Sequence, residues 1–273
     1  LKYTSKTKNC INFNEIKHGD ASVYQYQIDS NATSYISGTG DVAGNFEGAG
    51  LAFTLEADII LPNHVTIAEW HTVKENYGSK VANFYPIVKE ASLFGMHTAN
   101  GTENDLDWAT NDYANFQVST VKEDRFSSKA YFKLTGTVGG FIPTLTSSYF
   151  NDAYGDELWN ISVTIEPTKY PFVNQISGTV YGEGSAESPY TLKFYGVSYI
   201  ADYKAHEFLI TSSLTNTQGR QILANHKRIF VGAHRTNFTG VVREPTDIKV
   251  NSCRAWMTSL PTGTFDNHNL KVG

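Results

Sequence analysis

The chain has 273 residues, of which 40% are hydrophobic and 18% are charged, and its formal net charge is −5. A core of the corresponding size can be buried in one domain, because all-β domains of this length fold as single units. The charges are mixed in sign with no basic stripe, and no run of about 18 apolar residues is present, which excludes a nucleic-acid-binding face and a membrane-spanning helix.

Apolar and polar residues alternate with period two along most of the sequence, and this pattern predicts β-strands. The clearest strand runs over 158–165, where the odd-numbered positions from Trp159 to Ile165 are apolar and share one face. Helical signals are weak and predict at most a short turn over 215–225. In chain order, strands are predicted at 51–61, 92–97, 113–118, 129–134, 158–165, 190–197, 207–212, 228–234 and 248–256.

Many short strands separated by turn residues predict an all-β fold, either a sandwich or a barrel. We expect residues 1–36 to form an N-terminal strand or extension packed on the sandwich, 37–262 to form the sandwich itself, and 263–273 to be a C-terminal linker. Because the chain begins at Leu1 and not at Met, we also expect it to be part of a longer polypeptide.

Cys10 and Cys253 lie near opposite ends of the chain. The first and last strands of a sandwich are often neighbours, so a disulfide between them is one expectation. Two free thiols, as in a reducing cytoplasm, are the other, because two cysteines alone do not define a disulfide framework.

Glu56 and Asp58 alternate along the predicted strand 51–61, as the carboxylates of glycoside hydrolases do. In such enzymes a third carboxylate follows on the same strand, whereas here Ile59, Ile60 and Leu61 follow. The pair is therefore interpreted as the polar face of an edge or outer strand, and the sequence predicts a protein that is not an enzyme.

Residues 103–112 form the best candidate metal site, because they gather hard oxygen ligands that suit Ca²⁺. Asp105, Asp107 and Asp112 would be the ligands, and chelator would then lower the melting temperature. The loop does not match the pattern of an EF-hand, so a polar loop without metal is the alternative.

An aromatic face beside amide and carboxylate side chains is typical of a sugar-binding site. Trp108 and Tyr113, with Asn111 between them, form such a group and are predicted to bind a glycan. The alternative for Trp108 is a place in the core, where we also expect Trp159 and Trp256.

Six segments, taken in order, resemble strands of the laminin-G/concanavalin A-like jelly roll. Tyr195 stands in one of them where that superfamily usually has Asn. The resemblance implies an antiparallel two-sheet jelly-roll sandwich, and it implies the calcium ion that such domains often hold at a loop end. The segments are FTLEADI (53–59), SLFG (92–95), LWNISVT (158–164), YTLKFYGV (190–197), IFVGA (229–233), and the closing FTG, DIKV and AW (238–240, 247–250 and 255–256).

Within this superfamily the segments 113–118, 131–134 and 231–240 resemble domains in large structural proteins of tailed bacteriophages. That resemblance implies a non-catalytic structural and adhesive module at the virion surface. It would contact neighbouring subunits or cell-surface glycans within a homo-oligomeric assembly. The alternatives are a secreted, lectin-like carbohydrate-binding domain and a glycoside hydrolase or lyase on the same fold.

Overall fold

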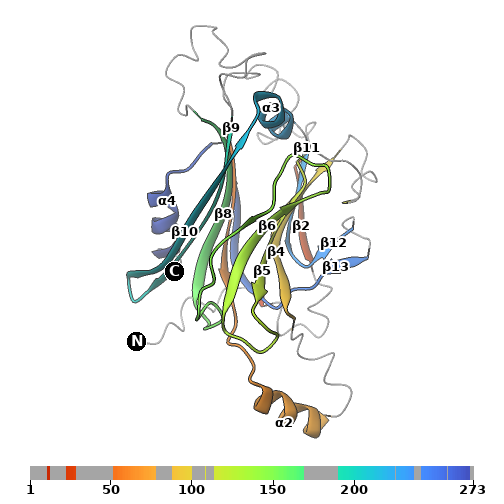
Figure 1. Ribbon diagram of the computed structural model, residues 1–273, viewed down its shortest axis with the longest axis vertical. Coiled ribbons are helices and arrows are strands. Elements are labelled where there is room, and N and C mark those ends of the chain that lie inside the picture. Colours follow the sequence, from red (N-terminus) through yellow and green to blue (C-terminus); the bar gives the residue numbers. More distant parts are fainter. Residues whose placement is uncertain are drawn as a thin grey trace.

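The computed structural model describes residues 11–12, 23–28, 52–77, 88–99, 108, 114–168, 190–224, 226–236, 241–256 and 258–270. Within these residues the chain forms two six-stranded antiparallel sheets that lie face to face, as Figure 1 shows. The predicted antiparallel two-sheet sandwich is therefore confirmed. No helix among the described residues is long and apolar enough to cross a membrane.

The first sheet, called sheet A, contains the strand with the clearest alternation, β8. Its order is β1 (Ile11–Asn12), β14 (Lys249–Trp256), β3 (Phe53–Ile60), β8 (Leu158–Pro167), β9 (Tyr190–Ile200) and β10 (Tyr203–Leu214).

The second sheet, called sheet B, has the order β2 (Val23–Ile28), β11 (His226–Gly232), β4 (Glu90–Ala99), β5 (Phe116–Lys122), β6 (Ala130–Gly136) and β7 (Leu145–Thr146). The short strands β1 and β2 each add to the edge of one sheet, by pairing with β14 and β11.

The alternating strands place their apolar side chains between the two sheets. Trp159, Ile161 and Val163 of β8 are buried there, and Trp159 packs against Phe132 of β6 and against Phe150, which is bridged to β6. Because successive side chains of a strand point to opposite faces, the polar residues of the same strands lie on the outer faces. The outer faces are therefore where chemistry can be placed without disturbing the core.

Among the described residues, three helices lie outside the sandwich: α2 (Ile67–Tyr77), α3 (Asn216–Ala224) and α4 (Thr262–Leu270). The helix α2 begins with a capping box, because Thr66 and Glu69 each bond the other's backbone N–H. That signal is visible in the sequence, but neither α2 nor α4 has an apolar stripe that would predict a helix. The segment expected as a C-terminal linker largely forms α4, which packs against β8 and β9.

A small hairpin of β12 (His234–Arg235) and β13 (Val242–Glu244) lies over the outer face of sheet B, beside β4. Gly232 ends β11 with a φ of 98°, a left-handed conformation that favours glycine and turns the chain out of the sheet. His234 of this hairpin therefore returns over the sheet that the chain has just left. The candidate site, described below, is formed by Glu244 of this hairpin and Glu90 of β4.

Candidate acid–base site

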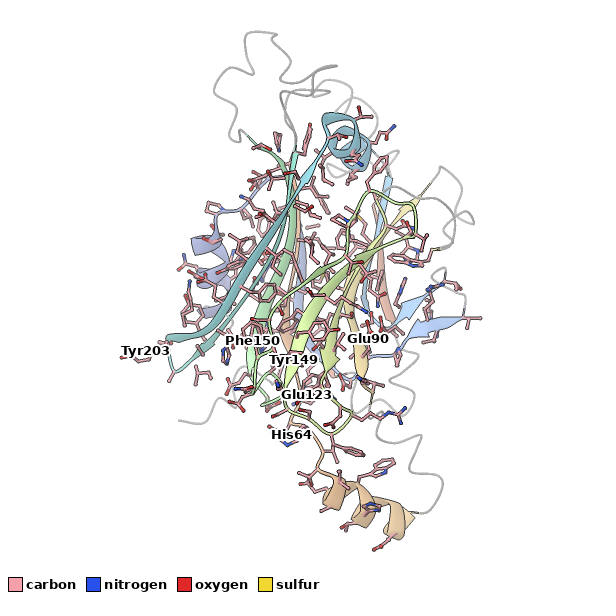
Figure 2. The ribbon with its side chains drawn as sticks, in the orientation of Figure 1. His64, Glu90, Glu123, Tyr149, Phe150 and Tyr203 are labelled. Atoms are coloured by element: carbon pink, nitrogen blue, oxygen red, sulfur yellow. The ribbon has the colours of Figure 1, made fainter. Side chains whose placement is uncertain are left out.

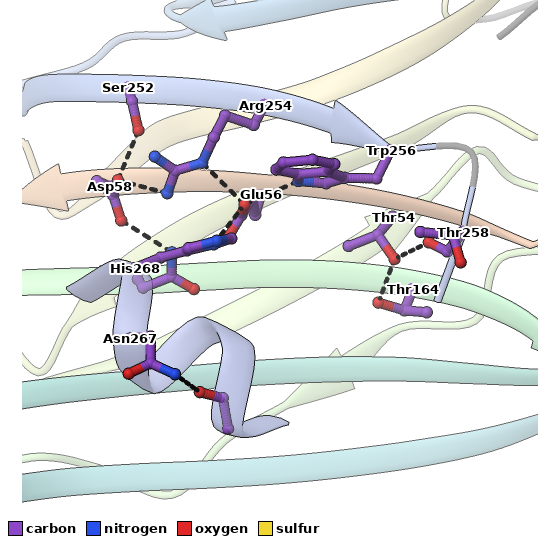
Figure 3. A network of polar contacts seen from close by, with 12 residues as sticks. Thr54, Glu56, Asp58, Thr164, Ser252, Arg254, Trp256, Thr258, Asn267 and His268 are labelled. Atoms are coloured by element: carbon purple, nitrogen blue, oxygen red, sulfur yellow. Dashed lines mark hydrogen bonds and ion pairs between the residues drawn. The ribbon is translucent and has the colours of Figure 1, made fainter. Parts of the chain in front are cut away.

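The outer face of sheet A carries a network of charged groups beneath α4, shown in Figure 3. Arg254 Nε donates to Glu56 Oε1 at 2.8 Å, and its Nη2 donates to Asp58 Oδ2 at 2.6 Å. Asn160 Nδ2 bridges the two carboxylates at 3.0 and 2.8 Å. Further donors complete the network: Trp256 Nε1 and His268 Nδ1 to Glu56, and Ser252 Oγ to Asp58.

Both carboxylates of this network are fully buried. Burial alone would raise the pKa of Glu56, but the donors from Arg254, Asn160 and His268 outweigh it and hold the pKa below its ordinary value. The interpretation of Glu56 and Asp58 as the polar face of an edge strand is wrong, because β3 lies inside sheet A, between β14 and β8. Every oxygen of the pair accepts a hydrogen bond, so neither carboxylate is open to a substrate.

Trp256 is also placed differently from the prediction that it lies in the core. It stands on the outer face of sheet A with Glu56 and stacks on the His268 ring at 5.9 Å. Trp159, by contrast, is fully buried in the core as predicted.

The outer face of sheet B carries a second pair of carboxyls, Glu90 of β4 and Glu244 of β13, which lie close enough for each to shift the pKa of the other. Lys133 forms an ion pair with Glu90, and Ser119 Oγ donates to Glu90 Oε1 at 3.0 Å. The Gln117 side-chain amide donates to Glu244. This acid pair is only partly covered, since the side chains of Glu90 and Lys133 are 32% and 24% exposed.

The two carboxyls of the acid pair hold different protonation states. Burial raises the pKa of Glu244 to about 8, and the neighbouring Glu90 carboxylate adds to the rise. Burial acts in the same direction on Glu90, but the Lys133 ammonium outweighs it and keeps the pKa of Glu90 below its ordinary value. At neutral pH Glu244 is therefore a carboxylic acid and Glu90 a carboxylate, a division typical of acid and base partners.

The loop after β13 fixes Glu244 in place through three successive residues. The Ser92 N–H donates to the Pro245 carbonyl at 2.8 Å, and Thr246 Oγ1 donates to the Ser92 carbonyl at 2.6 Å. Asp247 forms a buried ion pair with Lys122 at 3.0 Å. These bonds form where the register between β4 and β5 shifts, between Ser92 and Phe94, because the backbone of β4 can bind the loop there.

Two histidines lie next to the acid pair, one on β4 and one on the hairpin itself. His97 of β4 and His234 of β12 face each other with their Nε2 atoms 3.0 Å apart, so one ring donates a proton and the other accepts it. Burial lowers the pKa of His234 to about 2, which makes it neutral at pH 7. The His234 ring stacks on Phe230, and Gly95 leaves room for that phenyl ring, because a Cβ there would lie 2.6 Å from Phe230 Cζ.

Trp108 is the one predicted glycan-binding residue that the structure describes. It packs on His234 with ring centroids 4.5 Å apart, its backbone N–H donates to the Thr236 carbonyl at 2.7 Å, and it is 7% exposed. The structure thus brings Trp108 to the edge of the acid–base site in a packed position, and its binding of a sugar stays a prediction.

The other predicted ligands lie outside the described residues. They are Asn111 and Tyr113 for the glycan and Asp105, Asp107 and Asp112 for calcium, and the calcium site stays a prediction. Among the residues that the structure describes, no group of three or more His, Cys, Asp or Glu side chains could hold a metal ion. Cys253 is a free thiol, and burial raises its pKa to about 12; Cys10 is outside the described residues.

Sequence reasoning missed Glu90, Glu244 and Lys133. Each stands in an ordinary strand, and no motif links them, because they come from β4, β13 and β6. They are brought together because β4 pairs with β5 and β5 pairs with β6, and because the hairpin that carries Glu244 lies against β4. The one local signal is Gly232 itself, because a glycine inside the predicted strand 228–234 can mark a bend of the chain.

No protein-family model and no curated protein matches the chain. Among solved structures, it is similar to an alginate lyase from Klebsiella pneumoniae, with 12% identity and a TM-score of 0.38 over 87% of this chain and 81% of that one. An alginate lyase from Pseudomonas aeruginosa is 9% identical, with a TM-score of 0.34 over 77% of this chain and 67% of that one. A mutant of the alginate lyase Aly36B in complex with an alginate tetrasaccharide is 10% identical, with a TM-score of 0.31 over 77% and 71% of the two chains.

Two of the predictions made from the sequence are corrected here. The prediction of a non-catalytic virion module and the prediction that the chain is not an enzyme are both contradicted by these neighbours, which are alginate lyases. These neighbours also give no support to a link with bacteriophages, whereas the jelly-roll-like sandwich stands. At identities this low, neither a substrate nor the role of any residue is transferred from them.

Proposed function

We propose that the chain is a polysaccharide lyase that cleaves a uronate-containing polymer at the acid pair of sheet B. The observation that carries the proposal is the clustering of Glu90 and Glu244 around Lys133, Gln117 and Ser119 on a partly exposed face. A protonated acid, a carboxylate base and a cation within one cluster are the groups that an elimination next to a carboxylate needs.

The geometry of the pair favours elimination over hydrolysis. In glycoside hydrolases the two carboxyls flank the scissile bond and stand about 5–9.5 Å apart. Glu90 and Glu244 instead lie so close that each shifts the pKa of the other, which favours an acid and a base that act from the same side of the sugar. Glu56 and Asp58 fail for a second reason, because their oxygens are already taken by Arg254 and Asn160.

The proposed step balances without water or metal. Glu90 takes the proton from the carbon that bears the uronate carboxylate, the bond from the adjacent carbon to the glycosidic oxygen breaks, and a C=C bond forms between the two carbons. Glu244 gives its proton to the departing oxygen. The proton then passes from Glu90 back to the neighbouring Glu244 and resets the site.

Lys133 couples substrate binding to the strength of the base. Its ammonium holds the pKa of Glu90 low in the free protein. When it turns to the carboxylate of the bound sugar, Glu90 loses that stabilisation and its pKa rises toward the operating pH, where a general base is most effective. By neutralising the uronate carboxylate, the same cation also lowers the pKa of the adjacent carbon, which makes its proton easier to remove.

The test is an assay of the full chain on alginate, the polymer of the lyases named above, and on a neutral glucan as control. Elimination predicts new ultraviolet absorbance from the conjugated C=C and carboxylate, in step with new chain ends. Chain ends without that absorbance would indicate hydrolysis and would contradict the proposal. Absence of both on a panel of uronate polymers would overturn it as well.

A further inference from the structure

Beyond the acid pair, the outer face of sheet B carries an aromatic group on its last strands. Tyr131 of β6 and Tyr149 pack edge to face with ring centroids 5.0 Å apart. Phe150, next in the chain, is bridged to Ala130 by backbone bonds of 2.8 and 3.1 Å and points into the core, which leaves Tyr149 on the outside. Tyr149 is 46% exposed, so almost half of its surface remains in contact with solvent.

A cation stands over this aromatic group. The Lys129 ammonium lies 5.0 Å from the centroid of the Tyr149 ring, and it pairs at 2.8 Å with the carboxylate of Glu123. The side chains of that ion pair are 34% and 52% exposed, and an ion pair so exposed contributes little to stability. The ammonium can therefore exchange Glu123 for the carboxylate of a ligand at small cost.

Strand register places the aromatic group in line with the acid pair. Glu90 pairs with Val121 of β5, and Val121 pairs with Tyr131 of β6, so the three lie in one row across the sheet. At about 4.8 Å per strand, Tyr131 is roughly 10 Å from Glu90. Figure 2 shows Glu90 and Tyr149 on the same part of the sandwich, while Tyr203 stands at the outer tip of the β9–β10 hairpin.

We propose that Tyr131, Tyr149 and Lys129 form a second sugar subsite, which holds one anionic residue of the polymer beside the residue that is cleaved. The Tyr149 ring would stack on the sugar, and Lys129 would pair with its carboxylate. The subsite makes the protein selective for polymers with acidic residues next to the cleavage point. This inference rests on the proposed function for its substrate class, but it concerns binding and is tested without turnover.

The experiment measures the affinity of the full chain carrying Glu244→Gln for alginate by titration calorimetry, with carboxyl-reduced alginate as the neutral probe. Tyr149→Ala should weaken alginate binding about threefold to tenfold, since an aromatic contact contributes roughly 0.5–1.5 kcal/mol. Lys129→Met should weaken it up to about fivefold and leave binding of the neutral probe unchanged. Tyr203→Ala and Lys193→Met are matched controls, being an exposed tyrosine and a lysine of similar exposure in an ion pair on the other sheet.

The outcomes separate this inference from the proposed function. If the unmodified chain cleaves alginate but Tyr149→Ala and Lys129→Met bind it as tightly as the controls, the subsite is overturned and the lyase stands. If alginate binds and both variants weaken it while no elimination occurs, the subsite stands and the lyase falls. If alginate does not bind at all, both are overturned. A thermal melt of each variant excludes loss of binding through unfolding.

Discussion

On the outer face of sheet A, Glu56 and Asp58 are matched by the guanidinium of Arg254, whereas on sheet B, within the described part of the chain, the ammonium of Lys133 is the one cation paired with the carboxyls of Glu90 and Glu244. The first pair lies beneath α4 with every oxygen bonded, and its donors hold the pKa of Glu56 below its ordinary value. The second pair keeps one proton, because two adjacent carboxylates cannot both ionise with one cation beside them. Two acidic pairs on one scaffold thus differ in role: the first is matched by its cation within the fold, and the second, in the proposed function, supplies the proton that is transferred.

The largest expected difference between the two faces is in turnover. Glu244→Gln keeps the shape of the side chain but removes its transferable proton, so the rate should fall by about 10²–10⁴, the usual contribution of a general acid. Initial rates of formation of unsaturated product on a uronate polymer measure this. Glu56→Gln is the matched control and should leave the rate per folded molecule unchanged; the contrast would be broken if both variants, or neither, lost activity.

Stability should show the reverse difference. Arg254→Met leaves two fully buried carboxylates without their cation and should lower the free energy of unfolding by about 3–5 kcal/mol. Urea denaturation followed by tryptophan fluorescence measures the change. Arg243→Met, on the exposed β13 strand, is the control and should fall within about 0.5 kcal/mol of the unmodified chain. An equally small effect of Arg254→Met would mean that the network on sheet A is not structural.

The two faces should respond to pH in opposite directions. The folded pKa of Glu244 is raised from 4.5 to about 8, so the native state holds a proton that the unfolded state releases, and stability falls as pH rises through that window. The folded pKa of Glu56 is lowered, so its contribution is present above pH 4.5 and is lost as pH falls below it. Unfolding free energies measured across this range should therefore decline at both ends, and Glu244→Gln should flatten only the alkaline decline.

Turnover should decline in the same alkaline range as stability, because it needs Glu244 in its protonated form. The rate should fall as pH rises through about 8, where the Glu244 carboxyl loses its proton. A rate that kept rising beyond that pH would contradict the assignment of Glu244 as the acid.

The smallest expected effect on stability concerns the contact that holds α4 on sheet A. His268 Nδ1 lies 3.1 Å from Glu56 Oε2, but Glu56 keeps the donors Arg254, Asn160 and Trp256 when that ring is removed. His268→Ala should therefore cost only about 1 kcal/mol of unfolding free energy. Chemical denaturation measures it, with Asn267→Ala on the exposed side of α4 as control. A loss as large as that of Arg254→Met would show that α4 is required to bury the whole network.

The sequence by itself determined the alternating strands and the two-sheet sandwich. A period of two assigns each side chain of a strand such as β8 to one face, so Trp159 and Ile161 could be placed in the core before any tertiary contact was known. The same reasoning described Glu56 and Asp58 correctly as neighbours on one face. It could not state whether that face was open, because β3 becomes an inner strand only through pairing with β8 and β14.

Tertiary structure alone decided the candidate site. Glu244 reaches Glu90 because a short hairpin leaves sheet B after Gly232 and because Pro245, Thr246 and Asp247 anchor its far end. Alternation along a strand carries no information about which distant strand will lie opposite it. The proton on Glu244 is decided there too, because its pKa depends on burial and on one neighbouring carboxylate, and both arise only when the chain is folded.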